Sequence, residues 1–189
     1  MHLCAHCGEN TGVAAGEKRN SCAKCRSVTY CDRECQTANW GTHRKSCKPC
    51  GGYAFDQAIL GDETEDWRKT LKWSEYIEQH MKRHATPGPK IDQLRRYVLL
   101  IFTRAYATAS METGEHRYAH AAIPLLHERI ALHVKYQRFE EQVESISTLG
   151  RMLAQTLGDI NNEQVIACFQ RAHDIGTTHE ITGAAYITN

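Results

Sequence analysis

The sequence predicts a small metal-stabilised finger followed by an all-α segment of stacked helical hairpins. Three observations support this fold class. The first 47 of the 189 residues hold eight potential metal ligands in spaced pairs. Helical periodicity dominates the later part of the chain, and strand-like alternation is absent from Ile91 onward. Two segments of the helical part repeat at offsets of 43 and 44 residues, which is typical of stacked helical hairpins.

Seven cysteines and one histidine make up the ligand set. They fall into four pairs: Cys4-x2-Cys7, Cys22-x2-Cys25, Cys31-x3-Cys35 and His43-x3-Cys47. Eight such ligands complete two tetrahedral sites, and a zinc ion held by four protein ligands is structural, whereas a catalytic zinc keeps one position open. A C-x2-C pair fits around a tight turn, and residues four apart share one face of a helix. The sequence therefore predicts two structural Zn²⁺ ions, and spacing alone leaves open which ligands share an ion.

The alternative use of these cysteines, a disulfide framework, requires an oxidising compartment. The chain begins Met1-His2-Leu3-Cys4, which lacks the basic start, apolar segment and small-residue cleavage site of a secretion signal. The longest apolar run, Tyr97 to Phe102, is far too short to span a membrane. We therefore expect an intracellular protein, cytoplasmic or nuclear, with reduced thiols and no membrane partner.

The charge of the chain gives no general attraction to nucleic acid, since the net charge is +1. The first 50 residues carry eight Lys and Arg residues against four acids, a formal charge of +4. Seven thiolates and two Zn²⁺ ions would lower this charge to about +1. We therefore do not expect the finger to bind nucleic acid.

The ligand series resembles a known family in its second half. Residues 30–47 have the sequence YCDRECQTANWGTHRKSC. This segment resembles the second half of a MYND zinc finger, including the aromatic residue before the fifth ligand and the tryptophan three residues before the histidine. The ligand pattern of that family covers residues 4–47. In MYND fingers the two sites interleave, which implies one zinc on Cys4, Cys7, Cys31 and Cys35 and the other on Cys22, Cys25, His43 and Cys47. A sequential pairing of the first four and the last four ligands is the alternative.

Two features near the finger fall outside the family pattern. The insert from Glu9 to Ser21 is long and rich in glycine and polar residues, which predicts a flexible loop. Cys50 forms a further C-x2-C pair with Cys47. We predict that Cys50 is a spare thiol, because the eight earlier ligands already satisfy two ions.

The resemblance implies that the finger is a protein-binding module, often for short proline-containing peptides. A helix predicted over about residues 32–46 places Gln36 and Trp40 on one face. Trp40 would supply an apolar wall and Gln36 an amide for the peptide backbone. Alternatively, Trp40 fills the core of this small domain. Ala23 follows the third ligand, where peptide-binding members can carry a hydroxyl group.

The chain behind the finger divides at a strong helix break. A helix is predicted over about Glu65–His84, with Trp67, Leu71 and Ser74 along one stripe. Residues 85–89, with the sequence ATPGP, end that helix because neither proline can continue it. The predicted domains are therefore a finger over 1–50, a helical linker over 51–89 and helical repeats over 90–189.

The internal repeat lies in the last of these domains. Residues 123–132 align with residues 166–175, and residues 111–115 align with residues 155–159. The segment 149–172 is similar to a tetratricopeptide repeat, in which Leu149-Gly150 opens one helix, residues 157–159 make the turn, and an apolar stripe follows the next helix.

Two further expectations concern this repeat. The small residues Gly150 and Ala172 would let paired helices approach closely, although the period exceeds the 34 residues of the simplest repeat type. Glu180 to Asn189 looks like a helix without its partner, so we expect a truncated array.

Two function classes follow. The first is a non-enzymatic adaptor, in which the finger docks a short peptide and the helical repeats dock a second protein, with no small-molecule substrate. The second is a fragment of a SET/MYND-type protein lysine methyltransferase. That family carries a Gly-rich cofactor motif before its finger and an Asn-His pair after it. Neither motif occurs in this sequence, so the adaptor is the favoured interpretation.

Overall fold

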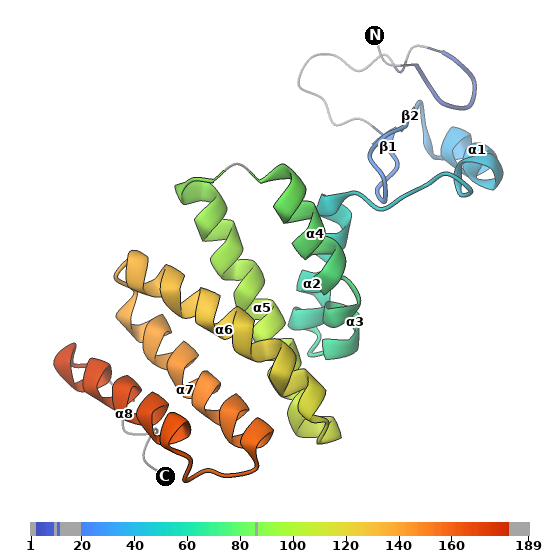
Figure 1. The fold of residues 1–189 in the computed structure, drawn as a ribbon. Coiled ribbons are helices and arrows are strands. Elements are labelled where there is room, and N and C mark those ends of the chain that lie inside the picture. The colour runs from blue at the N-terminus through green and yellow to red at the C-terminus, as the bar shows by residue number, and fades with distance from the viewer. Residues whose placement is uncertain (1–2, 10, 12–19, 86, 182–189) are drawn as a thin grey trace. The chain divides into compact units, whose positions relative to one another are not determined.

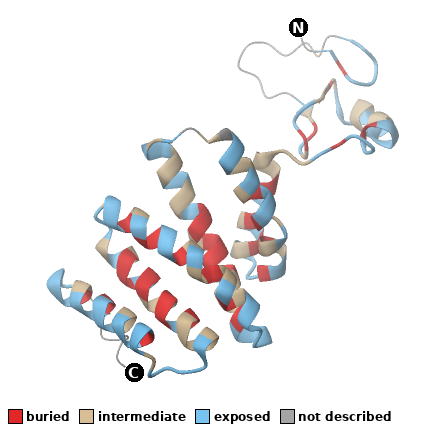
Figure 2. Ribbon diagram, in the orientation of Figure 1, coloured by how far each residue is buried: buried red, intermediate tan, exposed pale blue. Residues whose placement is uncertain are grey.

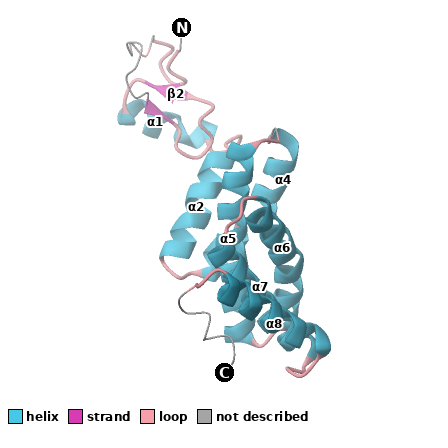
Figure 3. Ribbon diagram, turned by 90° about the vertical axis from the view of Figure 1, so that its left-hand side faces the viewer, coloured by secondary structure: helices cyan, strands magenta, loops and turns pink. Residues whose placement is uncertain are grey.

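The computed structural model describes residues 3–9, 11, 20–85 and 87–181 (Figure 1). The chain forms two compact units, Met1–Asp56 and Gln57–Asn189. The first unit contains the predicted finger, and the second contains helices. Among the described residues, strands occur in the first unit alone (Figure 3).

The finger is built from a short hairpin and one helix. Strand β1 (Asn20–Ser21) pairs antiparallel with β2 (Thr29–Tyr30), so that Asn20 lies opposite Tyr30. Helix α1 (Arg33–His43) falls within the predicted range of 32–46. It begins after Asp32, whose carboxylate accepts a hydrogen bond of 2.7 Å from the Cys35 N–H and so caps the helix. Most of the predicted flexible loop, residues 10 and 12–19, lies outside the described residues.

Apolar burial in the finger is slight. Its buried cluster consists of one aromatic residue and four thiols: Tyr30, Cys4, Cys22, Cys25 and Cys47. Tyr30 is 1% exposed, and the half-buried Val28 packs against the cluster. A core of this size cannot hold a domain of about 50 residues together without another source of stability.

Seven helices follow among the described residues. Their bounds are α2 (Gly51–Glu63), α3 (Trp67–Lys72), α4 (Ser74–His84), α5 (Pro89–Thr113), α6 (His116–Lys135), α7 (Phe139–Leu157) and α8 (Glu163–Thr178). The boundary between the two units falls inside α2, so this helix begins in the first unit and ends in the second.

Helices α5 to α8 form an ordered array in which each helix packs on the next (Figure 1). Short connections make neighbouring helices antiparallel. Gly114 and Gly158 end α5 and α7 with φ values of +68° and +67°, a conformation that glycine adopts without a steric penalty. Buried residues concentrate along α5, α6 and α7 (Figure 2).

An apolar cluster lies between α6 and α7, with one residue from α8. It contains nine buried residues: Ala119, Ala122, Leu126, Ile130, Val143, Ile146, Leu149, Met152 and Ala172. The same two helices also bury four polar residues: Arg129, His133, Gln142 and Ser145.

A smaller cluster joins Trp67 of α3 to Ala105 and Ala109 of α5. Trp67 also packs edge-on against Tyr118 of α6, with 5.3 Å between ring centroids. The indole N–H of Trp67 donates to Glu112 at 2.7 Å, so this buried side chain has its polar group satisfied.

The predicted close approach at Gly150 is confirmed. A Cβ atom at this position would lie 3.1 Å from the Phe169 ring and 3.3 Å from Cys168 Cβ, so these neighbours on α8 would have to shift by a few tenths of an ångström to admit it. Ala172 is fully buried in the same interface. Small residues therefore set the spacing of α7 and α8.

Two predictions about helix boundaries differ from the structure, and a third falls mainly outside the described residues. The helix expected over 65–84 is divided at Trp73, where the Trp73 N–H bonds to Thr70 O and the Ser74 hydroxyl bonds to Leu71 O. Helix α7 begins at Phe139, ten residues before the expected start at Leu149-Gly150. The helix expected over the last ten residues falls mainly on residues 182–189, outside the described residues.

Within the linker predicted over 51–89, the only helix given bounds was that over about 65–84, so α2, which starts at Gly51-Gly52 although glycine favours helices poorly, is an additional helix. Packing explains it, since Ala54 and Ala58 are fully buried. No helix among the described residues has both the length and the apolar character needed to cross a membrane.

Candidate metal centre and the groove beside it

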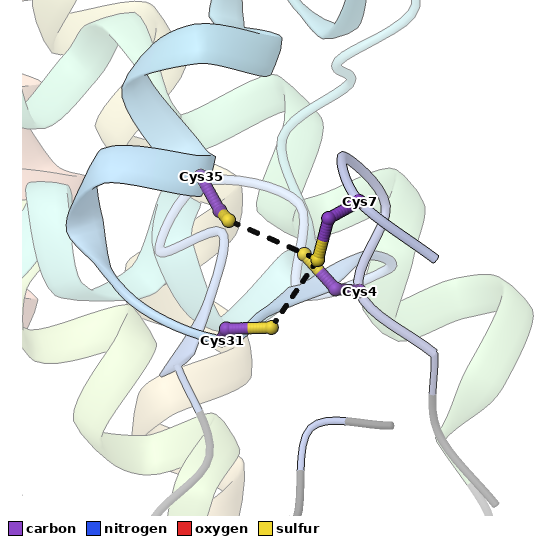
Figure 4. Close-up of side chains that lie close together, drawn as sticks. All are labelled: Cys4, Cys7, Cys31 and Cys35. Atoms are coloured by element: carbon purple, nitrogen blue, oxygen red, sulfur yellow. Dashed lines mark hydrogen bonds between the residues drawn. The ribbon is translucent and has the colours of Figure 1, made fainter. Parts of the chain in front are cut away.

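Two clusters of metal-ligating side chains form in the finger. The first contains Cys4, Cys7, Cys31 and Cys35, and its four sulfur atoms all lie within 4.8 Å of one another (Figure 4). The sulfur of Cys7 is 3.5 Å from that of Cys31 and 4.0 Å from that of Cys35. Ligands 24 or more residues apart in the chain therefore meet at one point.

The second cluster contains Cys22, Cys25, His43 and Cys47, all of them buried. The sulfur atoms of Cys22 and Cys47 are 3.8 Å apart, and Nε2 of His43 lies 3.4 Å from the sulfur of Cys25. The structure thus groups the eight ligands in the interleaved order and not in the sequential order. The eighth thiol of the finger region, Cys50, belongs to neither cluster.

Two similar turns position the C-x2-C pairs. The Gly8 N–H bonds to Cys4 O at 3.0 Å, and the Arg26 N–H bonds to Cys22 O at 2.8 Å. In both turns the residue after the second cysteine has a positive φ, +78° at Gly8 and +54° at Arg26. This conformation folds the chain back so that the two thiols of each pair face the same point.

Strand β2 and helix α1 join the two clusters. The first turn hydrogen-bonds to β2, since the Ala5 N–H donates to Thr29 O at 2.9 Å. Helix α1 carries Cys35 in its first turn and His43 in its last, so one helix supplies a ligand to each cluster. Asn39, on the same helix, donates to Ala5 O. Disruption of one cluster should therefore disturb the other.

The dimensions of both clusters suit zinc. A tetrahedral ion with Zn–S bonds of about 2.3 Å places its sulfur ligands about 3.8 Å apart, and a nitrogen ligand about 3.6 Å from a sulfur. Sulfur–sulfur distances of 3.5, 3.8 and 4.0 Å and a sulfur–nitrogen distance of 3.4 Å in the two clusters lie around these values. The donor sets are Cys₄ and Cys₃His, which are those of structural zinc sites. Each cluster could therefore hold one Zn²⁺ ion.

Electrostatics in the clusters also favour a cation. Burial opposes ionisation of Cys4, but backbone N–H donors outweigh it and lower the pKa of this thiol to about 6. Hydrogen bonding to Cys7, followed by burial, raises the pKa of Cys31 to about 11, and burial and the thiol of Cys22 raise the pKa of Cys47 to about 11. The thiols of one cluster therefore resist ionising together, and a divalent cation would supply the charge that stabilises four ionised or electron-rich donors.

Residues 4–47 match the family model described as the MYND finger. They form a MYND finger. No solved structure shows a significant match to the chain. The matched segment includes all eight ligands and ends before Cys50 and α2.

A groove lies on the surface of the MYND finger, with a volume of about 340 Å³. Its lining residues are Cys22, Ala23, Lys24, Gln36, Thr37, Trp40 and Tyr53. Trp40 is 42% exposed, so the interpretation that it fills the core is wrong. Its ring contacts His43 edge-on at a centroid distance of 5.9 Å, which places this exposed aromatic directly beside the second cluster.

The structure brings both expected peptide-binding side chains, Gln36 and Trp40, to this groove. It also places Ala23 there, so the groove has a methyl group at the position where peptide-binding members of the family can carry a hydroxyl group.

Sequence reasoning missed Tyr53, which reaches the groove from the first turn of α2. The Cys50 N–H bonds to Lys24 O at 2.8 Å, and the Tyr53 N–H bonds to the Cys50 sulfur at 3.4 Å. These bonds hold the start of α2 against the second C-x2-C turn. The sequence signal that could have identified Tyr53 was an aromatic residue a short distance after the last metal ligand.

Proposed function

We propose that this protein is a non-enzymatic adaptor, whose MYND finger docks a short proline-containing peptide and whose helical unit docks a second protein. MYND fingers are protein-interaction modules. All eight metal ligands are protein side chains in closed sets of four, which leaves no open position for zinc catalysis. The metals therefore act by holding the surface of the finger in shape.

The exposure of Trp40 is the observation that carries the proposal for the finger. A large aromatic side chain that is 42% exposed in a domain with so small a core is available to a ligand. Gln36 lies one helical turn away on the same face and offers both a donor and an acceptor. Aromatic walls with a nearby polar group suit proline-rich peptides, which are extended before they bind.

For the helical unit, the array α5–α8 supports a tetratricopeptide-like arrangement built from longer helices. The turns after α5 and α7 share a left-handed glycine 44 residues apart, Gly114 and Gly158. Stacked hairpins of this kind present extended surfaces to partner proteins. The helices are longer than a simple repeat requires, since α5 has 25 residues and α7 has 19.

The test is a binding measurement on the zinc-loaded full chain. An array of proline-containing ten-residue peptides identifies a binding peptide, and Trp40→Ala is then compared with the wild type. We expect a loss of about 2 kcal/mol, or roughly thirtyfold in affinity, because truncation of a central aromatic anchor typically has this effect. Arg44→Ala is the matched control, since Arg44 is exposed just after the end of α1 and does not line the groove. If Trp40→Ala kept two zinc ions and bound the peptide as tightly as the wild type, the groove would not be the docking site.

A further inference from the structure

The groove of the finger extends beyond the segment that matches the family. Six of its seven lining residues lie within residues 4–47, and the seventh, Tyr53, lies in the first turn of α2. Tyr53 belongs to the same compact unit as the finger, Met1–Asp56. The groove is therefore a property of the finger together with the start of α2.

Hydrogen bonds hold the start of α2 on the second C-x2-C turn. The Cys50 N–H donates to Lys24 O at 2.8 Å, and the Ala54 N–H donates to Cys50 O at 3.1 Å. The Tyr53 N–H donates to the Cys50 sulfur at 3.4 Å. This last bond satisfies one of the N–H groups that the first turn of a helix leaves without an intrahelical partner. Cys50 thus begins α2 while it is bonded to the ligand-bearing turn, and that turn sets the position of Tyr53.

A side-chain contact fixes α2 at a second point. Arg26 follows the second cysteine of the turn and pairs with Asp56 at 3.3 Å. Its guanidinium group also lies against Gly52, where a Cβ atom would stand only 2.9 Å from one terminal nitrogen. A single exposed ion pair adds little stability. Together with the bond at Cys50, however, it attaches two points of the first turns of α2 to the turn beside the groove.

The two aromatic side chains of the groove lie outside the core of the finger. The apolar cluster of the finger contains Tyr30 but neither Trp40 nor Tyr53. Trp40 is exposed and Tyr53 is half-buried, so both have surface that a ligand can cover. A groove with two aromatic side chains suits a segment in the polyproline II conformation, whose proline rings pack on aromatic surfaces.

Charge separates this use of two aromatic residues from the other common one. Aromatic side chains also bind ammonium groups through cation–π contacts, as in sites for methylated lysine. The charged side chain that lines this groove is Lys24, and among the described residues no carboxylate lines it. Because a lysine repels a second cation, the lining favours a neutral proline over a methylated lysine.

We propose that Tyr53 is a further peptide-contacting residue and that a proline ring of the bound peptide packs on it. Trp40 and Tyr53 then contact one peptide from α1 and from α2. The inference rests on the proposed docking role of the finger, and it assigns part of that role to a residue outside the matched segment.

The experiment uses the zinc-loaded full chain and an array of proline-containing ten-residue peptides, from which a peptide with Trp40-dependent binding is taken. Fluorescence anisotropy measures the affinities. Tyr53→Leu removes the flat ring but keeps an apolar side chain, and it should weaken binding about tenfold. Tyr53→Phe keeps the ring and should bind within about twofold of the wild type. Tyr97→Leu is the matched control, because Tyr97 is an exposed tyrosine of α5 that does not line the groove.

A double-mutant cycle locates the contact on the peptide. Each proline of the peptide is replaced by alanine in turn, and wild type and Tyr53→Leu are measured with every peptide. At one proline the two changes should be non-additive, so that Tyr53→Leu weakens the alanine peptide by less than about threefold, because the contact is already absent. A purely structural effect of Tyr53 would weaken all the peptides equally.

The contact is also observed without any variant that could misfold. In the complex of the wild-type chain, nuclear Overhauser effects should connect the ring protons of Tyr53 to those of the same proline. Native mass spectrometry should count two zinc ions in every variant, which shows that the finger is intact.

Four results would overturn the proposal: Tyr53→Leu with two zinc ions binds the peptide as tightly as the wild type, its effect is equal for every peptide of the cycle, no nuclear Overhauser effect connects Tyr53 to a proline, or a peptide with trimethyllysine in place of the proline binds more tightly. Failure of the finger's docking role is distinguishable, since Trp40→Ala would then bind as tightly as the wild type. Binding that depends on Trp40 but not on Tyr53 would remove Tyr53 from the site and leave that role standing.

Discussion

The apolar cluster of the MYND finger has five buried side chains, and four of them are cysteines. The apolar cluster of α6, α7 and α8 has nine buried side chains, and they are aliphatic residues and one methionine. The finger can therefore draw little free energy from the hydrophobic effect. A structural zinc ion contributes on the order of 10 kcal/mol in model peptides, while a fully buried leucine contributes about 1.5–3 kcal/mol. The free energy from two zinc ions would therefore exceed the hydrophobic contribution of Tyr30 and Val28 together.

The two units also differ in where a partner could contact them. In the finger, the ligands point inward to the clusters, and the aromatic residue that a ligand could contact, Trp40, stays on the surface. In the helical unit, a groove lies between packed helices, and Arg129 lines it with a side chain that is 4% exposed. The finger therefore has its ligand clusters inside and an exposed aromatic residue on its surface, while the helical unit has an apolar core and a groove between its helices.

Metal removal should produce the largest difference in stability between the finger and the helical unit. On addition of a zinc chelator to the full chain, we expect residues 20–47 to lose protection from hydrogen exchange, because their folding free energy comes from the ions. Helices α6 and α7 should keep their protection, because their core contains no metal ligand. Hydrogen-exchange mass spectrometry measures both regions in one sample, and native mass spectrometry should count two zinc ions before chelation. Loss of protection in both regions together would contradict this separation.

A matched pair of cysteine variants sharpens the same prediction. Cys25→Ser removes a ligand of the second cluster, and the coupling through α1 should weaken the first cluster as well, so at least one zinc ion is lost. Cys50→Ser changes a thiol that lies outside both clusters and should leave two zinc ions bound. Equal zinc content in the two variants would mean that the clusters do not hold the metal.

A substitution in the core of the helical unit should destabilise that unit and leave the zinc content of the finger unchanged. Leu126 is fully buried between α6 and α7, so Leu126→Ala should destabilise the helical unit by about 2–5 kcal/mol. The zinc content should stay at two. Leu157→Ala is the control, since Leu157 is 46% exposed at the end of α7 and its truncation should cost roughly 0.5 kcal/mol or less. Urea unfolding followed by far-UV circular dichroism measures both, and similar costs for the two leucines would show that the cluster of α6 and α7 is not the core.

The metal site was largely predictable from the sequence because tetrahedral coordination restricts where ligands can stand. The four spaced pairs gave the ligand set, and α1 lies within the helix predicted over 32–46. The grouping of ligands came from the family resemblance, since spacing allows two pairings. Trp40 remained ambiguous because hydrophobicity alone does not tell a core residue from an exposed one.

The features that the sequence did not reveal depend on contacts between distant residues. Helix α2 starts on two glycines because Ala54 and Ala58 are buried, and this places Tyr53 in the groove of the finger. Gly61 near the end of α2 approaches so closely that a Cβ there would lie 2.7 Å from Thr70 N. Arg129 has the residue type of a solvated helix face, and its burial follows only from the positions of α5 and α7 around it.

The smallest predicted effect is the pH dependence of the stability of the helical unit. Asp92, in the first turn of α5, accepts hydrogen bonds from Lys135 Nζ at 2.6 Å and from the Tyr136 hydroxyl at 2.7 Å, both at the end of α6. The bond from Lys135, followed by that from Tyr136, lowers the pKa of Asp92. A carboxyl group whose pKa is lower in the folded state stabilises that state above its unfolded pKa of about 3.9, and this contribution is lost as the pH falls through the folded pKa.

Asp92→Asn should therefore lower the stability of the helical unit slightly at pH 7 and change it less as the pH falls below about 4. Urea unfolding of wild type and variant at both pH values, followed by far-UV circular dichroism, measures the difference. The same acid protonates the thiolate ligands of the finger and releases its zinc, so the finger should unfold at a higher pH than the one that affects Asp92. A difference between wild type and Asp92→Asn that stayed constant across this range would show that the carboxylate charge does not join α5 to α6.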